Sequence, residues 1–102
     1  MKLEWTQPAV DDLQGIKDYI SKDSEFYASR FISRIIAAVE SLENMPKRGR
    51  KVPEADNENI RELIYQSYRI IYRVGENKIT VLSVIHGGRD ITKSDTKPWE
   101  IV

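Results

Sequence analysis

Near the N-terminus, apolar and polar residues alternate with one period in a first segment and with a longer period in the next. Residues 2–6 alternate apolar and polar side chains, which is the two-residue period of a short strand. From Ala9 to Ile20 apolar residues recur every three or four positions, which is the spacing of one helical face. Thr6 can cap this helix, and Pro8 suits its first turn. We therefore predict a strand followed directly by an amphipathic helix.

A second helix is predicted over about residues 24–44. Its apolar positions keep the helical spacing, and they are Ala28, Phe31, Ile32, Ile35, Val39 and Leu42. A polar break at residues 21–24 separates the two helices, Asp23 or Ser24 can supply the cap, and Pro46 ends the second helix. Because the connection is short, the helices should form an antiparallel hairpin that buries its apolar stripe on a sheet.

That sheet is predicted from three strands over residues 60–65, 68–74 and 78–85. Residues 46–59 before them contain two prolines and one glycine and have the composition of a surface loop. Short connections between the strands favour an antiparallel meander, and the last strand should be central because it is apolar on both faces. The predicted fold class is α+β: an N-terminal strand and an antiparallel helix hairpin packed on one face of a small twisted antiparallel sheet, in the order β-α-α-β-β-β.

The strand over residues 68–74 alternates strictly between two faces. One face should pack on the helices, and its residues are Tyr68, Ile70, Tyr72 and Val74. The other face then points Arg69 and Arg73 away from the helices. Arginine binds both phosphate and carboxylate well, so this pair could grip an RNA backbone or an acidic protein helix. The alternative is a solvated sheet face with ion pairs to Glu62 or Glu76.

Three further features have a chemical and a structural interpretation. His86, the only histidine, could act as a general acid or base, or it could hydrogen-bond the corner after the last strand. Four cations follow the second helix, and they are Lys47, Arg48, Arg50 and Lys51. They could bind phosphate, or they could solvate the loop and complement the negative end of the helix. Trp5 and Trp99 should anchor the core and the tail, with base stacking as the alternative.

Length and composition indicate the number of domains and argue against several kinds of site. The chain has 102 residues, which predicts one domain over residues 1–102, with a core at 1–91 and a C-terminal tail at 92–102. It has no cysteine and one histidine, so we expect no metal site, and no motif predicts a cofactor. No apolar run is long enough for a signal peptide or a membrane span, so we expect a cytoplasmic protein without membrane contact.

The net charge of zero conceals an uneven distribution. Residues 8–44 carry seven acidic and four basic side chains, whereas residues 45–97 carry seven acidic and eleven basic ones. The basic sheet half can attract an acidic or polyanionic partner, but its field is weak beside that of a dedicated nucleic-acid binder.

Several short motifs occur together from the first strand to the end of the sheet. They are Trp5, Ala9, Asp12-Leu13, Ile16 and Tyr19-Ile20; then Leu42, Pro46 and Gly49-Arg50; then Arg61-Glu62-Leu63; then Tyr68 to Val74; and finally His86 to Asp90. With these motifs the chain resembles the RelE/ParE superfamily of type II toxins, and more closely its ParE branch, the plasmid-stabilisation type. The resemblance extends over about residues 3–90.

The resemblance implies a helix hairpin on a twisted antiparallel sheet. It also implies a bacterial growth inhibitor neutralised by a cognate antitoxin, whose C-terminal segment wraps the toxin and through which the complex reaches operator DNA. ParE-like members inhibit DNA gyrase, with no established catalytic set, whereas RelE-like members cleave mRNA on the ribosome. A third reading is a non-toxic regulatory member of the fold. The zero net charge and a tail without tyrosine favour gyrase as the target.

The candidate residues follow from the strand pattern and from the resemblance. For binding a partner or target they are Arg50, Arg61, Arg69, Arg73, His86 and Arg89. For a nuclease, the catalytic set would be Arg69, His86 and Arg89, because cleavage by a 2′-hydroxyl needs a proton acceptor and cations at the phosphorus.

Overall fold

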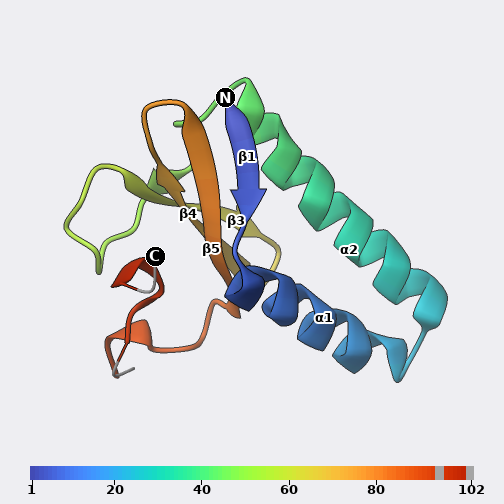
Figure 1. Ribbon diagram of the computed structural model, residues 1–102. Helices are drawn as coiled ribbons and strands as arrows, with labels where there is room; N and C mark the ends of the chain where they lie inside the picture. The colour runs from blue at the N-terminus through green and yellow to red at the C-terminus, as the bar shows by residue number, and fades with distance from the viewer. Residues whose placement is uncertain (94–95, 101–102) are drawn as a thin grey trace.

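The computed structural model describes residues 1–93 and 96–100, and it is an α+β fold as predicted (Figure 1). The helices are α1 (Gln7–Ser21) and α2 (Glu25–Glu40); the strands are β1 (Lys2–Trp5), β2 (Arg50–Lys51), β3 (Ile60–Tyr65), β4 (Tyr68–Val74) and β5 (Lys78–His86). Single 3-10 turns are η1 (Ser41–Glu43), η2 (Ile91–Lys93) and η3 (Pro98–Glu100). The second helix is therefore α-helical over a shorter span than predicted, and its last turn tightens into η1.

Side-chain caps begin both helices. The Thr6 hydroxyl oxygen accepts a hydrogen bond from the Ala9 N–H at 3.3 Å, and the Ser24 hydroxyl oxygen accepts one from the Tyr27 N–H at 3.1 Å. Each satisfies an N–H group that the first helical turn cannot pair internally. The Thr6 hydroxyl also donates to the Val81 carbonyl at 2.9 Å, which ties the start of α1 to the sheet. The predicted cap at Thr6 is confirmed.

The sheet has the strand order β1-β5-β4-β3-β2. β3, β4 and β5 form the predicted antiparallel meander, and β5 lies between β1 and β4. β1 pairs with β5 in parallel, so the sheet is mixed and not purely antiparallel. The chain reaches β5 only after both helices and the strands β2, β3 and β4, so no tight turn forces β1 and β5 to be antiparallel. A strand that the sequence pattern did not predict, β2, lies within the 46–59 loop and pairs Arg50 with Glu62.

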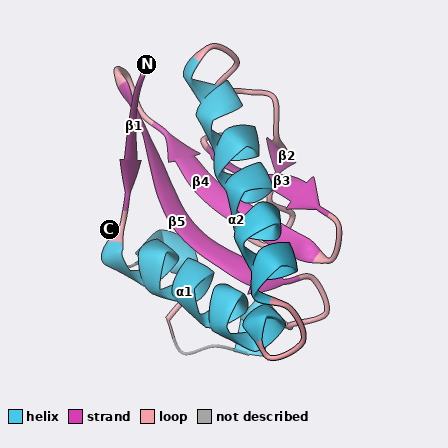
Figure 2. Ribbon diagram, turned by 90° about the vertical axis from the view of Figure 1, so that its right-hand side faces the viewer, coloured by secondary structure: helices cyan, strands magenta, loops and turns pink. Residues whose placement is uncertain are grey.

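The helix hairpin covers one face of the sheet (Figure 2). Ile35 and Leu42 of the α2–η1 segment are fully buried in one apolar cluster with Ile70 and Tyr72 of β4. The predicted assignment of alternate β4 residues to the helix side is therefore confirmed. The described residues include no helix with the length and apolar character that a membrane crossing requires.

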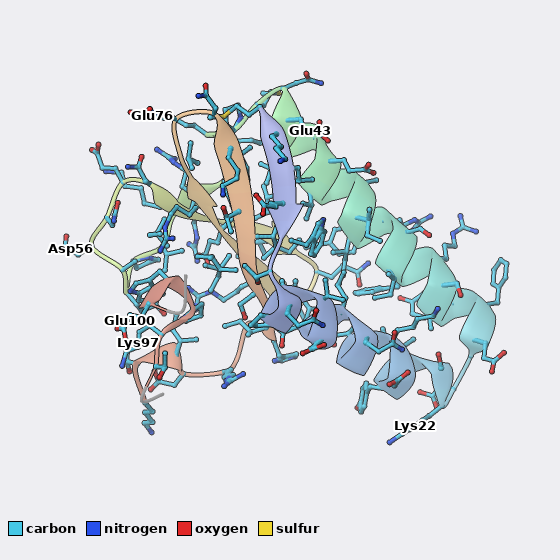
Figure 3. The ribbon with its side chains drawn as sticks, viewed as in Figure 1. Lys22, Glu43, Asp56, Glu76, Lys97 and Glu100 are labelled. Carbon is cyan, nitrogen blue, oxygen red and sulfur yellow. The ribbon has the colours of Figure 1, made fainter. Side chains whose placement is uncertain are left out.

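The opposite face, called here the far face, is also covered. A second apolar cluster lies there, and its buried members are Val52, Ile60, Ile71, Leu82, Ile85 and Ile91. The loop over residues 52–59 and the C-terminal tail supply its cover; Asp56 marks that loop, and Lys97 and Glu100 mark the tail (Figure 3). Trp99 packs on this cluster, as expected for a tail anchor, whereas Ile101 lies outside the described residues.

A β-bulge shifts the alternation of side chains along β5. Ile71 is opposite Ser83 while Tyr72 is opposite Val81, so Leu82 is an extra residue on β5. The extra residue changes which side chains face the helices. Leu82 joins the far-face cluster, whereas Val81 packs with the helix-side core.

Candidate functional site

Arg69 lies on the far face, as the alternation in β4 predicts, but it is 7% exposed. Its Nη1 and Nη2 atoms donate to the two carboxylate oxygens of Glu54 at 3.0 and 2.9 Å, and its Nε donates to Glu62. The prediction that this face is open was wrong, because the 52–59 loop brings Glu54 over the sheet. Of the predicted alternative, a solvated face with ion pairs to Glu62 or Glu76, the ion pair with Glu62 is present, but the face is covered and not solvated.

Glu62 continues this network to Arg50. The Glu62 side chain is fully buried, and its Oε2 accepts a hydrogen bond from the Arg50 Nε at 2.6 Å. The four residues Glu54, Arg69, Glu62 and Arg50 thus alternate in sign and form what we call the charged row. A buried carboxylate needs such partners, because an unpaired buried charge is strongly destabilising.

The pKa values of two members of the row reflect these contacts. The hydrogen bonds with Glu54, and then those with Glu62, hold the pKa of Arg69 above its usual value against the opposing effect of burial. The hydrogen bond from Arg69 holds the pKa of Glu54 below its usual value. Glu54 therefore acts as a fixed acceptor for Arg69, and with two arginines and two glutamates the row has no net formal charge.

Arg61 and Arg73 hold the chain together at two other places. The Arg61 Nη1 donates to the Gly49 carbonyl at 2.9 Å, which fastens the loop before β2. The Arg73 Nη2 donates to the Trp99 carbonyl at 2.5 Å, which fastens the tail to the far face. Arg73 is therefore also beneath a cover, contrary to the expectation of an open face.

His86 is the last residue of β5 and Arg89 follows it, and the two side chains line different hollows. His86 is exposed; its Nδ1 accepts a hydrogen bond from the Gly88 N–H at 3.2 Å, and its ring meets the Tyr68 ring edge to face, with centroids 5.6 Å apart. Arg89 lines a hollow of about 170 Å³ beside Asp12 and Pro98. Arg89 thus lines a different hollow from His86, although its backbone N–H donates to the His86 carbonyl at 3.0 Å.

Three of the predicted residues do meet at one place. Arg50, Arg69 and His86 line a depression of about 340 Å³, together with Ile64 and Tyr68 on its rim. We call it the Arg50–His86 depression. No group of three acidic or histidine side chains suited to a metal ion occurs within residues 1–93 and 96–100.

Gly49 and Tyr72 explain why the chain passes so close to the sheet before β2. A Cβ atom at position 49 would lie 2.5 Å from the Glu62 carbonyl oxygen and 2.6 Å from the Tyr72 hydroxyl oxygen. The Gly49 N–H donates to that hydroxyl at 2.9 Å, and the hydroxyl donates to the Pro46 carbonyl at 2.9 Å. The Pro46 and Gly49 pattern thus has a structural role, and burial raises the pKa of Tyr72.

Sequence reasoning missed two acidic residues. Glu54 is one of several acids in the loop, and nothing in the local pattern shows that it reaches β4. The Asp12 Oδ2 accepts hydrogen bonds from the Ser83 hydroxyl and the Val84 N–H, both at 2.9 Å, where the bulge interrupts β5. Asp12 belongs to one of the motifs singled out above, but its role depends on a bulge that the strand pattern did not reveal.

The sequence that forms this fold and site matches the model of a known protein family. The model described as "ParE toxin of type II toxin-antitoxin system, parDE" matches residues 3–91. The chain belongs to the ParE toxin family. As a ParE-family member it is a toxin of a type II toxin-antitoxin system within the RelE/ParE superfamily, and the family implies a cognate antitoxin as its partner.

Similar proteins agree with this assignment. The chain is 34% identical over 86 residues to "Toxin RelE2" of Caulobacter vibrioides, covering 83% of this chain and 93% of that protein. It is 33% identical over 87 residues to "Putative toxin Y4kP" of Sinorhizobium fredii, covering 83% and 86%. A chain of the structure titled "Chromosomal ParDE TA system from P. aeruginosa" superposes with a TM-score of 0.71 at 25% identity, over 84% of this chain and 95% of that chain.

Proposed function

We propose that this ParE-family toxin arrests growth in the cytoplasm by contact with DNA gyrase, without catalysis. We further propose that its antitoxin neutralises it by wrapping a C-terminal segment around it, and that the complex reaches operator DNA only through the antitoxin. The observation that carries the choice of target is the state of Arg69. All three nitrogens of its guanidinium donate to carboxylates inside the protein.

Cleavage of mRNA would require a different arrangement. Attack by a 2′-hydroxyl builds negative charge on the phosphate oxygens, and a free cation must stabilise that charge. Arg69 is neutralised by Glu54 and Glu62, and Arg89 lines another hollow. Of the predicted nuclease set, only His86 lies in the depression without a carboxylate partner, and the cation that shares the depression, Arg50, is outside that set and is held by Glu62 through its Nε. This geometry favours a binding toxin over the ribosome-dependent endoribonuclease.

The helix hairpin offers a surface suited to protein contact. It extends away from the sheet, and Lys22 marks its end (Figure 3). Near this end the aromatic side chains of Tyr19, Phe26 and Tyr27 are 69%, 76% and 49% exposed. We call these three residues the hairpin tip. Exposed aromatic side chains are enriched in protein interfaces because they bury a large area at low entropic cost.

The deciding experiment applies two assays to one toxin preparation: supercoiling by purified gyrase, and toeprinting on ribosomes translating a defined mRNA. We expect loss of supercoiling and no cut in the ribosomal A site. Cuts of the mRNA in the A site that disappear with His86→Ala, a substitution at an exposed residue, would instead support the RelE-like endoribonuclease. If neither assay responds and expression without the antitoxin leaves growth unchanged, the protein is a non-toxic regulatory member.

A further inference from the structure

The Arg50–His86 depression presents hydrogen-bond donors whose acceptors lie outside the chain. Arg50 uses its Nε for Glu62, and its side chain is 62% exposed. Its two terminal amino groups make no hydrogen bond to any of the described residues. These amino groups therefore remain available to a ligand.

His86 supplies a second outward donor. Because its Nδ1 accepts the Gly88 N–H, the neutral ring carries its proton on Nε2. Among the described residues no acceptor for Nε2 was found, and the side chain is exposed. Arg50 and His86 line the same depression, so two donors from different segments of the chain converge on one place.

The acceptors of the charged row point inward. Both carboxylate oxygens of Glu62 bind arginines of the row, and both oxygens of Glu54 bind Arg69. The depression is therefore rich in donors at its surface, although the row beneath it is neutral. A single carboxylate matches this arrangement, whereas a polyphosphate chain would find too little net positive charge.

An apolar neighbour completes the site. Ile64 on the rim is 54% exposed and lies on β3 beyond the two residues that β2 covers. We propose that the Arg50–His86 depression binds one aspartate or glutamate side chain of an acidic segment of the cognate antitoxin, with an adjacent apolar side chain of that segment resting on Ile64. This proposal rests on the partnership with the antitoxin and is independent of whether gyrase is the target.

The only histidine of the chain provides the measurement, because one imidazole gives one set of ring signals. The toxin of residues 1–102 is titrated with a short peptide alternating Glu and Leu, with the same peptide carrying Gln for Glu, and with oligouridylate. We expect the Glu peptide to move the His86 ring signals saturably, and the Gln peptide to bind about tenfold more weakly. Arg50→Gln should weaken binding of the Glu peptide by about tenfold.

Arg48→Gln is the matched control, because Arg48 lies in the same loop but donates to the Ser41 hydroxyl at 2.7 Å. It should leave peptide binding unchanged. Equal binding of the Gln and Glu peptides would overturn the proposal, as would equal effects of the two arginine variants. Tighter binding of oligouridylate than of the Glu peptide would assign the depression to nucleic acid and refute the peptide site.

A second arm uses the antitoxin encoded beside this chain. Arg50→Gln should weaken the toxin–antitoxin complex by about tenfold, while Arg48→Gln leaves that complex unchanged. An unchanged complex would refute the proposal for the natural partner. The gyrase assay distinguishes the proposed target from the proposed antitoxin site. Suppose that the parent toxin leaves supercoiling unchanged but Arg50→Gln still binds the antitoxin more weakly. The gyrase proposal then fails, and the antitoxin site is supported.

Discussion

The carboxylate of Glu54 accepts two nearly equal hydrogen bonds from the guanidinium of Arg69, 3.0 and 2.9 Å long. This bidentate contact joins a surface loop to the central strand of the sheet. Arg69 therefore has a structural role. A loss of toxicity in an Arg69 variant can be interpreted only when the stability of that variant has been measured.

Removing Arg69 should therefore destabilise the protein strongly. Arg69→Ala would leave Glu62, fully buried, with Arg50 as its only cation, and we expect the free energy of unfolding to fall by about 3 kcal/mol. Glu54→Gln should cost about 1 kcal/mol, because Glu54 is partly exposed and an amide keeps one acceptor. Urea denaturation measures both. A loss below 1 kcal/mol for Arg69→Ala would show that the charged row is not structural.

The same contact predicts an acid dependence of stability. The pKa of Glu54 is lower in the folded protein than in the unfolded chain, chiefly because of the hydrogen bond with Arg69. Stability from this group is present above the unfolded pKa and is lost as the pH falls from there through the lower folded pKa. The loss should be smaller in Glu54→Gln, as measured by urea unfolding at a series of pH values.

Glu58→Gln is the control for that comparison. Its side chain is 83% exposed and lies 3.7 Å from Lys51, so its ion pair should contribute little. We expect its stability to follow the parent profile over the whole acid range. If Glu58→Gln and Glu54→Gln flatten the profile equally, the acid dependence arises from general charge and not from the Glu54–Arg69 contact.

Two glycines should respond to alanine in opposite ways. Gly49→Ala would place its Cβ atom 2.5 Å from the Glu62 carbonyl oxygen, so the loop must move, and we expect a loss of at least about 2 kcal/mol. At Gly15, in α1, a Cβ atom would meet nothing within 4 Å, so Gly15→Ala should stabilise by up to about 1 kcal/mol. Thermal unfolding of the two variants tests the contrast, and a neutral Gly49→Ala would contradict the close approach.

The Tyr72 hydroxyl gives a third stability test. Tyr72→Phe would leave the Gly49 N–H and the Pro46 carbonyl without their shared partner, and we expect a cost of about 1–2 kcal/mol. Tyr65→Phe removes a hydroxyl that has no hydrogen bond in the described part of the chain and should change stability by less than about 0.5 kcal/mol. Similar values for the two variants in urea would show that the Tyr72 hydroxyl does not hold the loop.

The hairpin tip gives a functional test. Phe26 is 76% exposed, so Phe26→Ser should leave the unfolding free energy within about 0.5 kcal/mol of the parent. If the tip contacts gyrase, the concentration that halves supercoiling should rise by about tenfold or more. Met45→Ser, at a 59% exposed apolar residue outside the tip, should inhibit like the parent. Full inhibition by Phe26→Ser would remove the tip from the proposed contact.

The sequence alone was sufficient to predict both helices, every strand except β2, and the faces of β4. Helical spacing predicted α1 and α2, and the two-residue period of β4 assigned Tyr72 to the helix side and Arg69 to the far side. These features could be predicted because they follow from the backbone geometry of each segment taken separately. The family could also be predicted, because its motifs are spread over nearly the whole chain.

The tertiary structure decided what lies against those faces. The parallel pairing of β1, the strand β2 and the cover over the far face all depend on which distant segments meet, and the local period carries no information about that. Glu54 is 15 positions from Arg69 along the chain, and only the folded loop brings it within hydrogen-bond distance. An arginine that would be open to solvent in an isolated sheet, Arg69, is thus buried under the loop and paired with Glu54 and Glu62. Arg50 and His86, at the edge of the charged row, keep donors that point out of the protein.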